Sequence, residues 1–376
     1  MIETDIAVSS GMKISCGQDE LVAKLSVVAR AVSTRTAVQI LSGVLLRAED
    51  GELHLSATDM ELSLRTTLRA EVEGEGAVVV PGRLLLDIAR ALPDPEVAIE
   101  HGEDEGVVRI TCGPSNYRLN TYSAADFPRL PAVDGADLYP LERSTLLEAI
   151  GRVQRSASRD ESRPVLTGIF LRFERGRVVA AATDSYRLSV REAPLEAEVP
   201  ELEAIVPARA LAELARVAGG EGTLQLGIHE NQVLFGVEDV WLTTRRIDGQ
   251  FPNYRQLLPE SFEHELTIPR GELLDVVRRV AVMAQRNSPL RLRFADGELT
   301  VTARTQDVGE ASESLPVSYS AEPLEIGFNA EFLRDGIDSV AGEELVLSLI
   351  SPLRPAVMRS PDDDFTYLIM PIRLAG

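Results

Sequence analysis

The chain has 376 residues, a hydrophobic content of 44% and a formal net charge of −21 at pH 7. This length predicts two or three domains with ordinary buried cores. We find no apolar run long enough for a membrane-spanning helix and no pattern of a secretory signal in the acidic first residues. Cys16 and Cys112 are too few for a disulfide framework and form no metal pattern. We therefore expect a cytoplasmic protein whose two thiols are free and semi-buried.

Four landmarks recur three times, in the same order, along the chain. An amphipathic helix comes first, with leucines at helical spacing. A β-hairpin with a glycine in its turn follows, then a strand that leads into a second helix, and finally a closing strand. The first helices contain Leu21, Leu146 and Leu273, and the hairpin turns contain Gly51, Gly176 and Gly297. The second helices start after Pro81, Pro207 and Asn329, and the closing strands lead to Phe127-Pro128, Phe251-Pro252 and Met370-Pro371.

Each copy is roughly 120 residues long, which is a typical domain size. Two helices and many short strands predict an α+β domain with helices on one face of an antiparallel sheet. We place the domains at 1–137, 138–262 and 263–376, and expect 1–11 to be a disordered extension. Three similar domains in a row tend to trace an arc, and an arc with complementary ends can close as a head-to-tail dimer.

Arginine gathers in the first helix of each copy and in the turn that follows it. Residues 16–36, 141–163 and 268–291 each have a net positive formal charge, in contrast to the acidic whole. The second helices add Arg83, Arg90, Arg209, Arg216 and Arg334. If these helices line one surface, that surface suits a polyanion bound without sequence readout. A solvated helix face is the alternative interpretation.

Patterns typical of catalysis are absent from the sequence. The four histidines have no metal-ligand spacing, and no glycine-rich phosphate loop precedes a helix. Asp59 and Asp184 each follow a threonine in equivalent turns, where side-chain capping explains them. Residues 362–364, three consecutive aspartates, read as a solvated loop. We predict a protein that is not an enzyme and needs neither metal nor cofactor; a hydrolase that uses Asp184 or 362–364 is an alternative.

Several motifs together carry a resemblance to a known family. They are VPGRLLLDIARALP, AADFPRL, RPVLTGIFLRF, ATDSYRL, DGQFPNYRQLLP, IGFNAEFL and YLIMPIRL. In this order they resemble the bacterial DNA polymerase III beta subunit, the sliding clamp, from Met12 to Leu374. The resemblance implies a homodimeric ring with helices lining the hole, which encircles duplex DNA without sequence preference and gives the replicative polymerase its processivity. The alternative is a peptide-binding scaffold that does not encircle DNA.

The resemblance also implies a pocket between the second and third domains. Its partners would be short linear motifs of the polymerase, the clamp loader, other polymerases and repair proteins. The implied pocket residues are Arg163, Leu166, Thr183, Ser185, Tyr186, Arg187, Leu188, Pro252, Gln256, Leu257, Phe332, Leu353, Pro355, Leu368, Met370, Pro371, Ile372, Arg373 and Leu374. Gln256 stands where the family often has a basic residue, and Ala375-Gly376 extend past the family's usual end.

Two further residue sets follow from the resemblance. The DNA-facing set is Lys24, Arg35, Arg83, Arg159, Arg163, Arg209 and Arg286, and the dimer interface is Tyr117 and Leu119 with Val282 and Met283. The middle copy diverges from the first directly after the shared Thr-Asp, at Ser185 to Leu188. We interpret this divergence as specialisation for recognition. Arg187→Ala or Leu188→Ala should then abolish partner binding while preserving the dimer.

Overall fold

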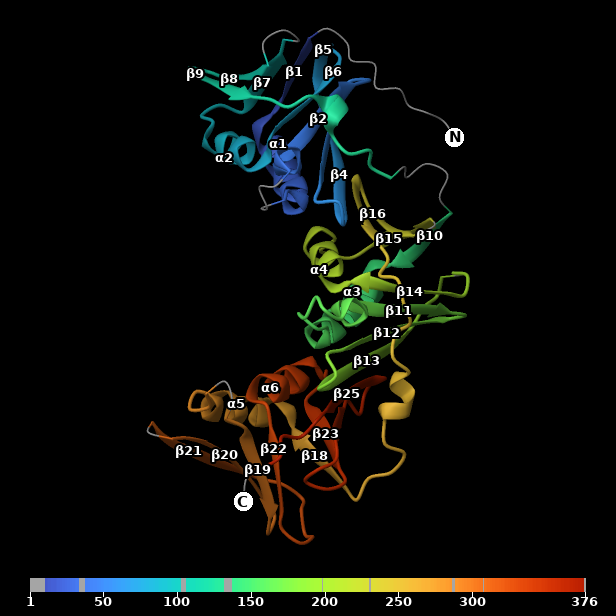
Figure 1. Ribbon diagram of the computed structural model, residues 1–376, viewed down its shortest axis with the longest axis vertical. Helices are drawn as coiled ribbons and strands as arrows, with labels where there is room; N and C mark the ends of the chain where they lie inside the picture. Colours follow the sequence, from blue (N-terminus) through green and yellow to red (C-terminus); the bar gives the residue numbers. More distant parts are fainter. Residues whose placement is uncertain are drawn as a thin grey trace. The chain divides into compact units, whose positions relative to one another are not determined.

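The computed structural model describes residues 11–33, 38–102, 106–131, 137–197, 199–229, 231–285, 288–306 and 308–374. The chain divides into two compact units (Figure 1). Unit 1 contains Met1–Leu141 and Glu213–Arg246, and unit 2 contains Glu142–Ala212 and Ile247–Gly376. None of the helices in the described ranges is long and apolar enough to cross a membrane.

Unit 1 has two antiparallel sheets and two helices, α1 (Gln18–Val28) and α2 (Gly82–Ala91). The five-stranded sheet has the order β5 (Glu71–Gly74), β1 (Met12–Gly17), β7 (Glu96–His101), β8 (Val107–Cys112), β9 (Ser115–Asn120). The eight-stranded sheet has the order β10 (Leu138–Glu142), β15 (Thr223–His229), β16 (Gln232–Val237), β17 (Val240–Arg245), β4 (Leu62–Arg69), β3 (Glu52–Thr58), β2 (Gly43–Glu49), β6 (Gly76–Pro81).

Unit 2 repeats this plan with helices α3 (Arg143–Val153), α5 (Arg270–Ala281) and α6 (Ala330–Ser339). Its eight-stranded sheet has the order β14 (Leu202–Pro207), β11 (Gly168–Glu174), β12 (Arg177–Thr183), β13 (Arg187–Pro194), β25 (Phe365–Ile369), β24 (Ala356–Arg359), β23 (Glu344–Leu349), β18 (His264–Pro269). Its four-stranded sheet has the order β21 (Gly309–Pro316), β20 (Glu298–Thr305), β19 (Leu290–Ala295), β22 (Leu324–Phe328). Helix α4 (Ala208–Val217) contains the boundary between the two units.

The three-copy prediction is confirmed by the order of elements. Both predicted helices are present in each copy, and the named strand pairings are antiparallel, as expected for the α+β class. The hairpin glycines Gly51, Gly176 and Gly297 have φ angles of 78°, 78° and 82°, which a residue with a side chain rarely adopts. Cys16 and Cys112 are free, as expected, but buried rather than semi-buried.

Two of the sheets cross from one sequence copy into the next. In unit 1, β4 of the first copy pairs with β17 of the second, with Leu64 opposite Leu242. In unit 2, β13 of the second copy pairs with β25 of the third, with Leu188 opposite Leu368. Main-chain hydrogen bonds therefore join the copies at two equivalent junctions. We call them the first junction (β4–β17) and the second junction (β13–β25).

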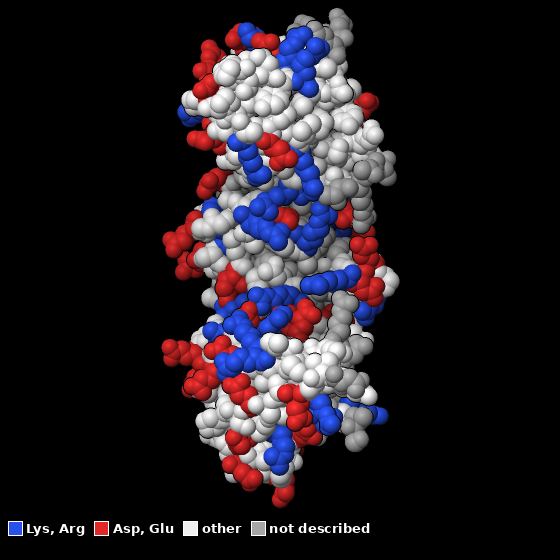
Figure 2. Space-filling model, turned by 90° about the vertical axis from the view of Figure 1, so that its left-hand side faces the viewer, with Lys and Arg blue, Asp and Glu red and all other residues white. Residues whose placement is uncertain are grey.

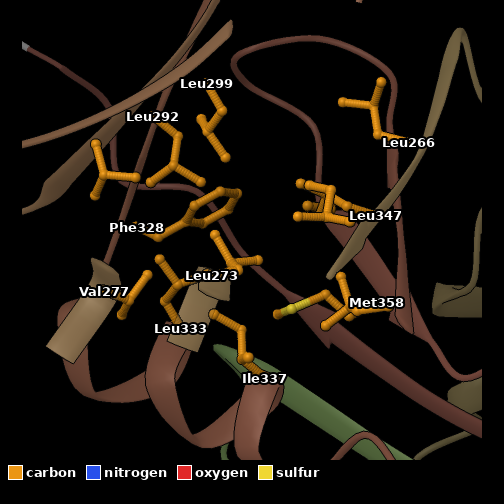
Figure 3. Packing of buried hydrophobic residues seen from close by; sticks show 14 of the residues in the cluster. Leu266, Leu273, Val277, Leu292, Leu299, Phe328, Leu333, Ile337, Leu347 and Met358 are labelled. Atoms are coloured by element: carbon orange, nitrogen blue, oxygen red, sulfur yellow. The ribbon is translucent and has the colours of Figure 1, made fainter. Parts of the chain in front are cut away.

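The hydrophobic core of the third copy lies between its helices and sheets (Figure 3). Phe328 of β22 lies among Leu273 and Val277 of α5 and Leu333 of α6 in this view. Helix α6 also approaches β25 closely, because Gly336 has no side chain: a Cβ atom there would lie 2.5 Å from Cε1 of Tyr367. This contact fixes α6 against the strand that forms the second junction.

Candidate functional site

The turn that leads into β13 is built by side chains of its own sequence. Thr183 Oγ1 donates a hydrogen bond to the carbonyl of Arg187 at 2.7 Å. Asp184 Oδ1 accepts hydrogen bonds from the N–H groups of Tyr186 and Arg187 at 2.9 and 3.0 Å. Ser185 takes a φ of 79°, which turns the chain sharply. The capping role predicted for Asp184 is therefore confirmed.

This turn presents one side chain outward and one inward. Tyr186 is 62% exposed, and the N–H of Met370 donates to the Tyr186 carbonyl at 2.8 Å, which ties the turn to the end of β25. Arg187 is only 6% exposed. Its Nε donates to Asp184 at 3.1 Å and its Nη1 to Asp335 of α6 at 2.7 Å.

Further contacts complete the environment of the Arg187 guanidinium. Its Nη2 donates to the Arg155 carbonyl, and its plane lies over the Phe332 ring, 4.3 Å from the ring centre. Burial alone would lower the pKa of Arg187, but Tyr367 and the two carboxylates outweigh it and raise the pKa. The buried Arg187 guanidinium thus stabilises the turn, and its charge is not available to solvent or to a ligand.

Exposed apolar side chains gather on the elements around this turn. Among the described residues eleven large apolar side chains are exposed, and five belong to the predicted pocket. These five are Tyr186, Leu257, Leu353, Met370 and Ile372. We call them the exposed apolar set. Soluble proteins rarely leave several large apolar side chains open on neighbouring elements without a binding role.

The other predicted pocket residues lie at or beneath the surface. Leu166, Thr183, Leu188 and Leu368 are buried, and Leu188 and Leu368 belong to a cluster that contains Phe251 and Tyr254. The remaining side chains are partly or fully exposed: Arg163, Ser185, Pro252, Gln256, Phe332, Pro355, Pro371, Arg373 and Leu374. The residue set predicted from the sequence therefore contains both buried and exposed residues of this region, and the sequence did not indicate which were which.

The C-terminal segment after β25 is held against β22. The N–H of Ile372 donates to the Gly327 carbonyl at 2.7 Å. A Cβ atom on Gly327 would lie 2.5 Å from Cδ2 of Leu374, so this glycine makes room for the Leu374 side chain. The segment that carries Met370 and Ile372 is therefore held at Met370 by the Tyr186 carbonyl and at Ile372 by the Gly327 carbonyl.

The first junction reproduces the same backbone with different side chains. Thr58 Oγ1 donates to the Leu62 carbonyl at 3.0 Å, and Asp59 Oδ1 accepts from the N–H groups of Glu61 and Leu62. The N–H of Arg245 donates to the Glu61 carbonyl at 3.3 Å, as that of Met370 does to Tyr186.

Side chains at equivalent positions of the two junctions differ in polarity. The first junction exposes Glu61 and Arg245 where the second exposes Tyr186 and Met370, and it buries Leu62 where the second has Arg187. Met60, 53% exposed, is an apolar exception on the first turn. The shared hydrogen bonds form the junction, and the side chains differentiate its surface.

Three family models match the chain in sequence order. They describe the N-terminal, central and C-terminal domains of the DNA polymerase III beta subunit, and they match residues 12–131, 140–253 and 255–373. The chain belongs to the DNA polymerase III beta subunit family. The fold is accordingly that of three tandem clamp domains.

Individual relatives of this beta subunit family agree over almost the whole chain. The beta sliding clamp of Synechococcus elongatus is 36% identical over 376 residues, which cover 96% of this chain and 100% of the relative. The sliding clamp of Bacillus subtilis superposes with a TM-score of 0.92 at 26% identity, covering 97% of this chain and 100% of that one. The clamp of Bartonella birtlesii bound to griselimycin has a TM-score of 0.89 at 30% identity, with 97% and 100% covered.

The cations that the family resemblance assigned to DNA are in different environments. Lys24 of α1 is 2.5 Å from Asp239 in the β16–β17 turn, so its charge is neutralised at the first junction. Burial acts to raise the pKa of Asp239, but hydrogen bonds from Lys24 and Thr66 outweigh it and lower the pKa. Arg163 pairs with Asp160 at 3.2 Å and donates to Ser185. Arg209 is exposed.

Two of the predicted DNA-facing cations are exposed to solvent and free of ion pairs with the described residues. They are Arg83 and Arg159. Arg35 and Arg286 lie outside the described residues, as do 1–10 of the expected extension and Ala375-Gly376. In unit 2, basic side chains gather on the side that carries the helices (Figure 2).

The predicted dimer residues lie at the ends of the repeat series. Tyr117 is half-buried and Leu119 buried, both on β9, whereas Val282, at the end of α5, is 82% exposed and Met283 half-buried. Within the described part of the chain, β9 and β21 are edge strands of their sheets.

Sequence reasoning missed the acidic partners of these sites. Asp335 and Asp239 act through contacts 148 and 215 residues away in the chain, and neither has a local signature. Asp363, in the 362–364 cluster, pairs with Arg152 at 2.6 Å and accepts a hydrogen bond from the Phe365 N–H. Within the described residues no group of His, Cys, Asp or Glu is arranged to hold a metal ion.

Proposed function

We propose that the chain is a DNA sliding clamp, a processivity factor that encircles duplex DNA and tethers DNA polymerase and other DNA-processing proteins. Three domains, at 1–137, 138–262 and 263–376, would contribute to a ring of two copies. The protein would act in the cytoplasm, where bacterial DNA lies, and would perform no catalysis itself. The family membership supports the clamp role, and the contrast between the two junctions supports the position of the partner surface.

The partner-binding surface is proposed at the second junction. Its exposed apolar set suits a short peptide with aliphatic or aromatic anchors, because each anchor would remove apolar area from water. Exposed polar groups at its margin, such as Arg163 and Gln256, would orient the peptide. The observation that carries this proposal is the replacement of Glu61 and Arg245 by Tyr186 and Met370 on an otherwise equivalent backbone.

This contrast supplies a matched experiment. Griselimycin is the probe, since the related clamp of Bartonella birtlesii is bound to it. Tyr186→Ala and Met370→Ala should each weaken griselimycin binding by about tenfold or more in calorimetry, because truncating a central aromatic or apolar contact costs about 2 kcal/mol or more. The control variants Glu61→Ala and Arg245→Ala change the equivalent positions of the first junction and should leave the dissociation constant unchanged. Equal effects at both junctions would contradict the proposed position.

DNA binding is proposed to be topological, with weak contacts from the helix face. Arg83, Arg159 and Arg209 would contact phosphates without reading bases. A loaded clamp should remain on closed circular DNA and leave linear duplex by sliding off its ends. Charge reversal at Arg83 and Arg159 should weaken the binding of linear duplex and reduce its salt dependence, while the retention on closed circular DNA persists. Release from closed circular DNA as fast as from linear duplex would favour a peptide-binding scaffold without DNA encirclement.

The head-to-tail dimer is proposed to repeat the internal junctions. Strand β21 of the third copy is equivalent to β4 and β13, and β9 of the first copy is equivalent to β17 and β25. Applying the internal register to two chains places Val308 of one copy opposite Asn120 of the other, and Gly309 opposite Leu119. Val308 is exposed, as expected for a residue beside an edge strand that pairs with a second chain.

The end of α5 supports the same arrangement. Arg30 and Arg155, at equivalent places after α1 and α3, pair with Glu213 and Asp338 of the following copy. The third copy has the exposed Val282 instead, which favours an apolar contact with another chain. The mass in solution should be twice the 41.0 kDa of one chain. A single-chain mass at micromolar concentration would refute the dimer.

A further inference from the structure

Asp335 is a buried carboxylate whose two oxygens face different groups. It lies on α6 and is 7% exposed. Its Oδ2 accepts the hydrogen bond from Nη1 of Arg187 at 2.7 Å. Its Oδ1 lies 3.5 Å from Nη2 of Arg334 and 3.8 Å from Nη1 of Arg155, both on the helix side. The Asp335 side chain therefore connects Arg187 in the turn of the second junction with Arg334 and Arg155.

The helix that carries Asp335 is firmly placed. Leu333 and Ile337 anchor α6 in the core of the third copy (Figure 3). Tyr367 of β25 packs against Gly336, and its hydroxyl donates to the Phe332 carbonyl at 2.7 Å. The Phe332 ring in turn lies beneath the Arg187 guanidinium. Helix α6 thus holds this guanidinium by a charge and by a ring face, while Asp184 holds it from its own turn.

The first junction shows which part of this arrangement is common to both. There, Glu213 of α4 pairs with Arg30 at 3.2 Å, as the α6 carboxylates pair with Arg155. An acidic group on the second helix therefore serves both junctions. The position of Arg187, however, is occupied by the buried apolar Leu62. The pairing between helix and turn is present only where the turn exposes a tyrosine.

We propose that Asp335, together with Phe332, is a positioning residue for partner recognition. It fixes Arg187, and through Arg187 the turn that presents Tyr186 and accepts the Met370 hydrogen bond. The recognition surface is then assembled from two domains: the turn from the second, and the helix that orients it from the third. This inference rests on the proposed function of the exposed apolar set.

The test compares two carboxylates on the same helix. Asp335→Asn keeps the side-chain shape and removes the charge that holds Arg187. Asp338→Asn is the matched control, because Asp338 pairs with Arg155 and Arg278 but not with Arg187. Griselimycin affinity of the full-length dimer is measured by calorimetry, with circular dichroism to confirm folding. We expect a roughly tenfold loss for Asp335→Asn, as for a hydrogen bond to a charged group, and less than a twofold change for Asp338→Asn.

A double-mutant cycle separates positioning from general stability. If Asp335 acts through the turn, Tyr186→Ala combined with Asp335→Asn should lose much less affinity than the sum of the two single losses. Additive losses, or equal losses for Asp335→Asn and Asp338→Asn, overturn the positioning role. If Asp335→Asn does not fold, Phe332→Leu replaces it in the cycle with the same criterion. If Tyr186→Ala alone has no effect, the proposed partner surface itself is refuted.

Discussion

Replacing Arg187 with alanine tests whether burial decides the strength of an ion pair in the β12–β13 hairpin. Arg187 and Arg177 lie on the same hairpin, and each contacts two carboxylates: Asp184 and Asp335 for Arg187, Glu174 and Glu192 for Arg177. The Arg187 side chain is 7% exposed and its two partners 13% and 10%, whereas the Arg177 side chain is 46% exposed. Arg177→Ala is therefore the matched control.

The expected magnitudes differ because of solvent. Breaking a buried ion pair costs about 3–5 kcal/mol, since the remaining charge stays desolvated. Arg187→Ala leaves two such carboxylates, and we expect about 3 kcal/mol because both retain some water. The partly exposed carboxylates beside Arg177 remain hydrated after its removal, so we expect no measurable loss there. Arg187→Ala thus perturbs local stability as well as partner binding, which makes Tyr186→Ala the cleaner test of recognition.

Hydrogen exchange followed by mass spectrometry measures this locally, as a protein of several domains need not unfold in one step. Peptides covering 184–194 and 365–374 should exchange on the order of 100-fold faster in Arg187→Ala, the equivalent of about 3 kcal/mol. Arg177→Ala should match the wild type. Similar rates in the two variants, or acceleration in both, would refute the argument from burial.

Three further predictions concern other parts of the molecule. Gly327→Ala should displace the Leu374 side chain and weaken griselimycin binding severalfold, with the dimer intact by sedimentation; unchanged affinity would show that the C-terminal segment adjusts freely. Val282→Asp should shift the mass towards one chain, whereas Met60→Asp, equally an exposed apolar-to-acid change, should not. Burial, and secondarily Glu20, raises the pKa of the Cys16 thiol to about 12, above that of the unfolded chain. The neutral thiol then stabilises the fold fully below about pH 8.5, and this contribution is lost as pH rises towards 12. Cys16→Ala should reduce that alkaline loss in thermal melts, and an identical pH profile would contradict it.

Much of the fold was readable from the sequence because its signals are local. Helical spacing around Leu21, Leu146 and Leu273 and the turn glycines require only neighbouring residues. The capping of the turns by Asp59 and Asp184 was predictable for the same reason, as Asx and Thr side chains bond to backbone two to four residues on. Because the unit is repeated three times, each helix or turn predicted in one copy could be compared with its equivalents in the other two copies.

The sequence alone therefore determined three α+β copies, their helices and the divergence of the turn at Ser185 to Leu188. Only the tertiary structure decided which side chains of that turn face outward. It showed Tyr186 exposed and Arg187 buried against Asp335, a partner 148 residues away. The physical reason is that burial and ion pairing depend on which strands and helices meet. The β13–β25 junction and helix α6 bring Arg187 and Asp335 together. A contact between residues so far apart in the chain leaves no periodic pattern in the sequence.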